Sequence, residues 1–166
     1  MEINNLQDLF GSTLSAIYDA ERILCRILPG LADYAGNEAL AEILRQHRNE
    51  TEWQMKRLNR ITDILGLPRS VKRNEAIRGI IAEFRESIGG IRDKKVLDVA
   101  LVTSVRKIKH YEIATYSSLS SLAMELGHTQ IGEMLNQSLI EEEKTDETLL
   151  VLAREGIYEE ARKRAA

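Results

Sequence analysis

The chain has 166 residues, of which 43% are hydrophobic and 30% are charged, and its formal net charge is −3 at pH 7. This length and apolar content suit one globular domain with a sizeable core and exclude a disordered chain. Basic and acidic residues are interspersed, without the basic stripe that nucleic acid requires, so we expect no nucleic-acid partner. The apolar runs are too short to span a bilayer, so we expect no membrane partner.

The cellular compartment is indicated by two features of the sequence. The beginning of the chain, MEINNLQDLF, lacks the basic start and the apolar run of a secretory signal peptide. The single cysteine, Cys25, cannot form an internal disulfide. Both features fit a reducing environment, and we therefore expect a cytoplasmic protein.

Apolar residues recur at three- and four-residue steps almost throughout the chain, which predicts an all-α fold. The first helix is expected at about residues 4–34, with a kink near Pro29 and an end at Gly36. The second is expected at about residues 38–65, with Asn37 as its N-cap. These two helices would form an antiparallel hairpin because the turn between them is short.

The connection at residues 67–93 is the longest, and Asn74 is positioned to cap a short amphipathic helix within it. A third long helix is expected at residues 94–126 and a fourth at residues 129–155, with YEEARKRAA as a frayed helical end. Two hairpins joined by one long crossover have the connectivity of a ferritin-like four-helix bundle. No linker divides the chain, so we predict a single domain over residues 1–166.

Ionisable residues interrupt the apolar stripe of each long helix, at positions Glu21, His47, Glu50, Glu112, Glu142 and Asp146. Two helices joined by a tight turn run antiparallel, so residues equally distant from the turn lie at one level. Reflection through the first turn places Glu21 opposite Glu50. Reflection through the second turn places Glu112 opposite Glu142 or Glu143.

Electrostatics restricts what such a cluster can be. Five buried carboxylates, at several kcal/mol each, would exceed the roughly 5–15 kcal/mol that stabilises a domain. Besides His47, the basic partner expected on the stripe is Lys109, which reflection places near Asp146. Two divalent cations would balance the charge better, and carboxylate and imidazole ligands suit iron, manganese or zinc. The sequence therefore predicts a metal site formed by all six interrupting residues; a metal-free network linked by lysine and water is the alternative.

Other polar residues near this level have weaker claims to a role. Tyr18, Tyr111 and Tyr116 are able to hydrogen-bond the carboxylates, although packing in the core or at its rim is the more common role. His110 lies off the stripe and is expected at the surface or at an interface. His128 follows a glycine and is expected in a turn.

The segments that carry these residues resemble the YciE/YciF-like bacterial stress proteins of the ferritin-like superfamily, namely IYDAE at 17–21, HRNET at 47–51, KHYEIATY at 109–116 and EEEKTDETL at 141–149. The resemblance covers nearly the whole chain. It implies a homodimeric, all-helical protein related to rubrerythrins and ferritins, associated with stress responses and without an established reaction. Whether the protein is an enzyme is therefore left open.

The resemblance also carries ligand roles. Glu21 and Glu112 match the single glutamates on the first and third helices of di-metal relatives, which carry Glu-x-x-His on the other two helices. Here the second helix has the reverse order, His47-x-x-Glu50, and the fourth lacks a histidine. Two iron ions that react with oxygen or peroxide are the expected cofactor. Lys109 stands where the family is often acidic, which would weaken the second metal position.

In that arrangement Glu50 and Glu142 would bridge the two ions. The terminal ligands would be Glu21, His47, Glu112 and Asp146.

Overall fold

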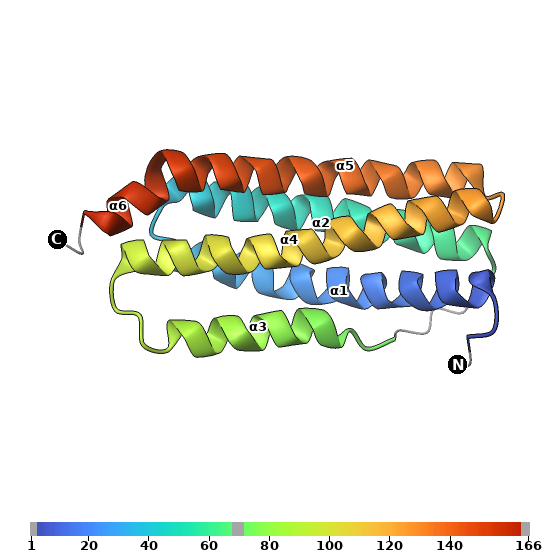
Figure 1. Ribbon diagram of the computed structural model, residues 1–166, viewed down its shortest axis with the longest axis horizontal. Helices are drawn as coiled ribbons and strands as arrows, with labels where there is room; N and C mark the ends of the chain where they lie inside the picture. Colours follow the sequence, from blue (N-terminus) through green and yellow to red (C-terminus); the bar gives the residue numbers. More distant parts are fainter. Residues whose placement is uncertain (1–2, 68–71, 164–166) are drawn as a thin grey trace.

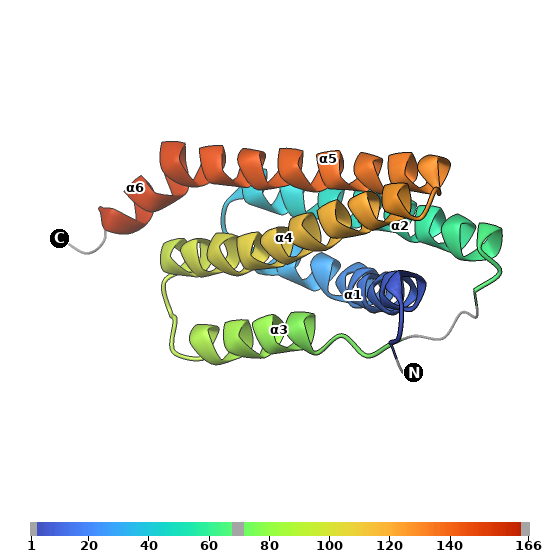
Figure 2. The ribbon, with the colours of Figure 1, turned by 45° about the vertical axis from the view of Figure 1, so that its right-hand side comes forward.

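The computed structural model describes residues 3–67 and 72–163 of the chain. All regular elements within these ranges are helices, and the four long ones are α1 (Leu6–Tyr34), α2 (Glu38–Ile64), α4 (Lys94–Glu125) and α5 (Thr129–Leu152). The hairpins α1–α2 and α4–α5 pack side by side, and the shorter α3 (Glu75–Ile88) lies outside them along α4 (Figure 1 and Figure 2). The predicted ferritin-like bundle with a short helix in its crossover is confirmed.

Local sequence accounts for the helix boundaries. Asn5, Asn37 and Asn74 precede α1, α2 and α3, and the side-chain oxygen of each accepts a backbone N–H from the first turn. Gly66 and Gly127 have φ of 60° and 77°, the left-handed backbone that lets the chain leave α2 and α4. Two of these caps, before α2 and α3, were predicted from the sequence and are confirmed.

Two expectations from the sequence concern Pro29 in the first helix and the end of the last helix. Pro29 lies inside α1, which continues past it to Tyr34, and the kink stays a prediction. Beyond α5 the chain forms a π-helical turn (Ala153–Ile157) and a short helix, α6 (Tyr158–Arg162), where we expected a continuous helix with a frayed end. Residues 164–166 of that end, and Pro68 of the expected stop after α2, lie outside the described residues.

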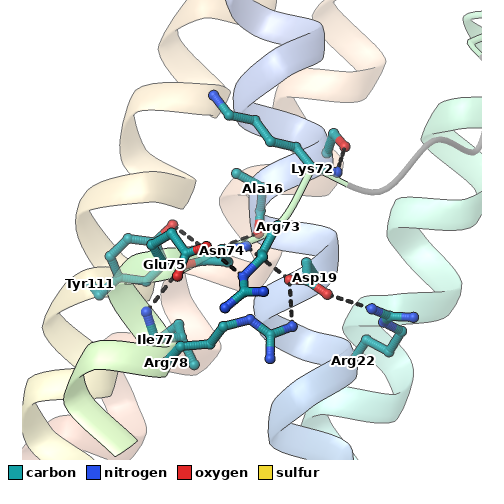
Figure 3. Close-up of polar contacts among 11 residues, drawn as sticks. Ala16, Asp19, Arg22, Lys72, Arg73, Asn74, Glu75, Ile77, Arg78 and Tyr111 are labelled. Atoms are coloured by element: carbon teal, nitrogen blue, oxygen red, sulfur yellow. Dashed lines mark hydrogen bonds and ion pairs between the residues drawn. The ribbon is translucent and has the colours of Figure 1, made fainter. Parts of the chain in front are cut away.

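The start of α3 is fixed to the bundle by one asparagine. The backbone N–H of Asn74 donates to Asp19 Oδ2 at 2.8 Å, and its side-chain amide donates to the Ala16 carbonyl at 2.8 Å and to Tyr111 Oη at 2.7 Å (Figure 3). Its side-chain oxygen accepts from Ile77 N at 3.0 Å. Asn74 therefore joins α3 to both α1 and α4.

The core consists mainly of leucine, isoleucine and smaller apolar side chains from the four long helices, with Phe10 and Tyr116 among them and Ile77 and Phe84 added by α3. Near the middle of each long helix, buried polar residues interrupt this apolar packing. None of the described helices is long and apolar enough to cross a membrane. The polar interruption is the feature that distinguishes this bundle from a purely structural core.

Candidate functional site

Each of the four long helices contributes fully buried polar side chains to one level of the bundle. We call this group the polar layer, and its members are Glu21, His47, Thr51, Gln54, Lys109, Glu112, Tyr116 and Glu142. Their spacings by three, four or seven residues within each helix turn them to the inward face. Charges buried this deeply must be paired or neutralised.

Lys109 connects three helices within the polar layer. Its Nζ lies 2.9 Å from Glu112 Oε2 on its own helix, and it also contacts His47 Nε2 on α2 and Glu142 Oε2 on α5. Burial alone would lower the pKa of Lys109, but the carboxylates of Glu112 and Glu142 outweigh burial and raise its pKa above the ordinary value. The layer therefore contains its own cation.

The protonation states follow from burial and from that cation. Burial would raise the pKa of Glu142, but Lys109 holds it at about 2. Burial and the charge of Glu142 raise the pKa of Glu21 to about 8, and the same causes raise the pKa of Glu112 well above its usual range. Burial and Lys109 lower the pKa of His47 to about 3. Burial thus favours the neutral forms of Glu21, Glu112 and His47, whereas Lys109 and Glu142 form a buried ion pair.

Hydrogen bonds pair some of the buried polar atoms of the polar layer. Tyr116 Oη donates to Glu21 Oε1 at 2.6 Å, and Gln54 Nε2 donates to Glu142 Oε1 at 2.7 Å. Of the three tyrosines considered from the sequence, Tyr116 is the one that hydrogen-bonds a predicted ligand. Glu112 Oε2 is the atom that faces Lys109 Nζ. Several other buried atoms have no hydrogen-bond partner among the described residues, namely Glu21 Oε2, His47 Nδ1, Thr51 Oγ1, Gln54 Oε1 and Glu112 Oε1. Such atoms normally pair with a proton, a water or an ion.

Glu50 lies outside the polar layer. It is half-buried and accepts hydrogen bonds from Thr145 Oγ1 at 3.0 Å and from Gln46 Nε2 at 2.9 Å. Residues 47, 51 and 54 share one face of α2, whereas position 50 lies at the edge of that face. Thr51, which the sequence analysis passed over, occupies the inward position.

Asp146 also lies outside the polar layer, near the rim of the bundle. Arg106 holds it with two hydrogen bonds, at 2.9 and 3.0 Å, and the exposed His110 lies 3.5 Å away. Lys109 is instead turned inward to the carboxylates of Glu112 and Glu142, one turn away from Asp146 on α5, and Arg106 is the residue that pairs with Asp146.

The donor set can be compared with what a metal centre needs. One ligand atom each from His47, Glu112 and Glu142 lie within 4.8 Å of one another, which is close enough to hold one ion. These are the same three groups that contact the Lys109 ammonium. Two ions in a ferritin-like bundle use about six carboxylate and histidine ligands. With Lys109 in place and Thr51 and Gln54 on α2, the buried residues do not fit a pair of ions.

The difference between the polar layer and a di-metal ligand set is visible in the sequence. Thr51 and Gln54 stand three residues apart on α2, as do Glu142 and Thr145 on α5. This is the spacing of the Glu-x-x-His motif in di-metal bundles. Neutral side chains replace three of the four residues that such motifs would supply.

Comparisons with known proteins agree with this architecture. The family model described as "Domain of unknown function (DUF892)" matches residues 5–162. Protein YciF of Escherichia coli (strain K12) is 34% identical over 167 residues, covering 99% of this chain and 100% of that protein. Among solved structures, YcfI from Rhodopseudomonas palustris is 38% identical with a TM-score of 0.86, covering 89% of this chain and 94% of that one.

The structure of the E. coli stress protein YciF also has a TM-score of 0.86, and covers 91% of this chain and 96% of that one. A protein from Xanthomonas campestris pv. campestris is 16% identical with a TM-score of 0.76, which supports the fold alone. The family match and the full-length similarity lead to one identification. The chain belongs to the DUF892 family and is a YciE/YciF-like protein.

Proposed function

We propose that this chain is a stress-associated structural protein whose buried acidic layer is completed by Lys109 in place of metal ions, and that it acts as a homodimer. One observation carries the proposal: Lys109 contacts all three groups that would otherwise bind an ion. The description of E. coli YciF as a stress protein supports the stress association. The description of YcfI as a candidate structural protein supports the structural role.

The size of the electrostatic effect supports a metal-free layer. A divalent ion about 4 Å from an ammonium is repelled by on the order of 8 kcal/mol at an effective dielectric constant of about 20. Deprotonating Lys109 to relieve this repulsion is costly, because the neighbouring carboxylates raise its pKa. A metal ion would therefore have to displace the lysine side chain from a fully buried position.

The test is metal binding by the wild-type protein and by Lys109→Met, which keeps an unbranched side chain of nearly the same length and removes the charge. We expect the purified wild-type protein to take up less than one equivalent of Fe(II) anaerobically, and to show no absorption change in air. Lys109→Met should gain a site for one ion. The matched control is Lys107→Met, on the same helix but solvent-exposed and paired with Glu83, which should behave as wild type.

Tight uptake of two ions by the wild-type protein would contradict the proposal. In that case Glu21→Ala combined with Glu112→Ala would show whether the ions bind in the polar layer. Loss of uptake in that variant would establish the di-iron interpretation of the sequence, in which Glu50 and Asp146 also move inward as ligands. Unchanged uptake would assign the metal to another part of the molecule.

A second function is favoured by a different observation. Glu112 Oε1 is buried without a hydrogen-bond partner among the described residues, and a ligand atom of Glu112 lies within reach of His47 and Glu142. If Lys109 swings aside, these three residues would hold a single divalent ion, and iron there would supply redox chemistry toward oxygen or peroxide. Uptake of one equivalent by the wild-type protein, weakened by His47→Ala, is the result that distinguishes this function.

A further inference from the structure

A groove between α1 and α3 combines an apolar cavity with a basic one. The apolar cavity has a volume of about 310 Å³, and its lining includes Ile27, Ile81, Phe84 and Ile108 from α1, α3 and α4. The basic cavity, of about 360 Å³, is lined by four arginines of α1 and α3. The two cavities share lining residues, among them Arg26 and Arg85, and therefore adjoin.

The positive charge of the basic cavity is only partly balanced. Its lining contains Arg22, Arg26, Arg78 and Arg85 and no acidic residue. Among the described residues the carboxylate that pairs with these arginines is Asp19, which accepts from Arg22 Nη2 at 2.7 Å and from Arg78 Nη2 at 3.3 Å, and Figure 3 shows it between them. Four guanidinium groups against one carboxylate leave three positive charges.

Several donors in this cavity are unused. Arg26 and Arg85 make no ion pair or hydrogen bond within the described part of the chain, and the Nε atoms of Arg22 and Arg78 are buried without a partner there. A guanidinium presents paired N–H donors whose geometry matches a carboxylate. The basic cavity is therefore complementary to an anionic group.

We propose that this groove binds a single-chain anionic amphiphile of the fatty-acid class. Its carboxylate would lie against the arginines, and its hydrocarbon chain would occupy the apolar cavity beneath α3. Each cavity has a volume in the range of small-molecule sites, about 300–1,000 Å³. The charge excess selects an anion, and the adjoining isoleucine and phenylalanine side chains select an apolar chain over a small inorganic ion. This site is separate from the polar layer and does not depend on its chemistry.

The test is calorimetric titration of the full chain with dodecanoate, and amide chemical shifts locate the binding site. We expect saturable binding with one equivalent, and shifts concentrated in α1 and α3. Dodecanol, which has the same chain without the charge, and acetate, which has the charge without the chain, should each bind more weakly by about tenfold or more. The comparison separates the contribution of the carboxylate to the affinity from that of the hydrocarbon chain.

A pair of variants tests the arginines. Arg26→Gln combined with Arg85→Gln should weaken dodecanoate binding by about tenfold or more and leave the melting temperature unchanged or higher, since it reduces repulsion between like charges. The matched control, Arg45→Gln with Arg48→Gln, removes two charges from α2 outside both cavities and should change affinity by less than about twofold.

Several results would overturn the proposal. These are the absence of saturable binding, equal affinity for dodecanol, unchanged affinity in the double arginine variant, or shifts that map to another face. Binding to phosphatidylglycerol vesicles without binding of free dodecanoate would instead assign the arginines to a membrane surface.

Discussion

At the scale of single residues, Lys109 determines what the polar layer is able to do. A buried lysine surrounded by carboxylates is both a counter-charge and a hydrogen-bond donor, so one side chain satisfies needs that would otherwise require an ion. Lys109 favours the ionised form of Glu142, whereas burial favours the protonated forms of Glu21 and Glu112. One ion pair among groups that burial drives toward their neutral forms explains how so many acids are tolerated in a core.

Removing that cation should destabilise the fold and create a dependence on metal. Lys109→Met leaves the Glu142 carboxylate buried without its partner, and breaking a buried pair in this way costs about 3–5 kcal/mol. Urea unfolding in the presence of a chelator should show this loss, and saturating Mn(II) should recover part of it by binding the folded state. Lys107→Met should change the free energy of unfolding by less than about 0.5 kcal/mol. If both variants unfold alike, Lys109 does not stabilise the layer.

The buried carboxyl group of Asp19 should make the stability of the fold depend on pH in the acidic range. Burial would raise its pKa, but the N–H of Asn74 and the guanidiniums of Arg22 and Arg78 outweigh burial and hold the pKa below the ordinary value. The folded state therefore favours the charged form, so its contribution is present above about pH 4 and is lost as the pH falls through the folded pKa.

The variant Asp19→Asn tests this sign. It should lower the free energy of unfolding by about 1–3 kcal/mol near neutral pH, because charge-assisted hydrogen bonds to a buried carboxylate are lost. The difference from wild type should shrink at acidic pH, as the wild-type carboxyl becomes protonated below its folded pKa. Urea unfolding near neutral pH and at acidic pH measures it. A difference that is constant across this range would show that the charge of Asp19 is not responsible.

At the scale of the helices, the periodicity of apolar residues predicts where a helix lies in the sequence better than it predicts which side chains face the core. The expected helices agree with α1 to α5 within a few residues because glycine and asparagine mark their ends. On α2, however, positions 50 and 51 both continue the three- and four-residue steps from position 47, and periodicity alone cannot choose between them. The structure turns Thr51 inward and leaves Glu50 at the edge. Glu50 instead bonds Thr145 on α5, a contact between distant parts of the chain that no local pattern encodes.

The attachment of α3 leads to a prediction for this element. Asn74 is a helix cap and also bonds Asp19, Ala16 and Tyr111, so Asn74→Ala removes the cap and both side-chain amide contacts. We expect a loss of about 2–3 kcal/mol, compared with about 1 kcal/mol for Asn5→Ala, an exposed cap with local contacts. Amide hydrogen exchange should accelerate most in α3. Equal losses for the two caps would mean that the links to α1 and α4 add nothing.

At the scale of the whole molecule, the sequence indicates each hairpin but not how the two hairpins meet. Reflection through a short turn relates residues within one hairpin, and it correctly brings Glu112 and Glu142 to one level. The contacts between hairpins, such as Lys109 with His47 and Gln54 with Glu142, depend on the crossover between α2 and α4. A crossover of this length allows many alignments of the two hairpins. The sequence therefore shows that a lysine lies near the predicted metal site, but not which groups it contacts.

The proposed homodimer leads to the last prediction. Trp53 on α2 is 63% exposed and Ile140 on α5 is 56% exposed, which places them among the most exposed large apolar side chains of the described residues. The two flank the hydrogen bonds that join α2 to α5, including Arg57 with Glu141 at 2.8 Å, so they lie near one level of the bundle. Burial of this face against a second copy would cover both. Light scattering should therefore give a dimer for wild type and a monomer for Trp53→Glu combined with Ile140→Glu.

The matched control is Leu6→Glu with Tyr34→Glu, which changes two exposed apolar residues at the opposite ends of α1 and should leave the dimer intact. The single tryptophan gives a second readout, because dilution of a dimer that covers Trp53 should shift its fluorescence to longer wavelength. A monomeric wild-type protein would refute the homodimer itself. A dimer that persists in the Trp53 and Ile140 variant would move the interface to another face, since two buried carboxylates there would cost far more than an apolar contact supplies.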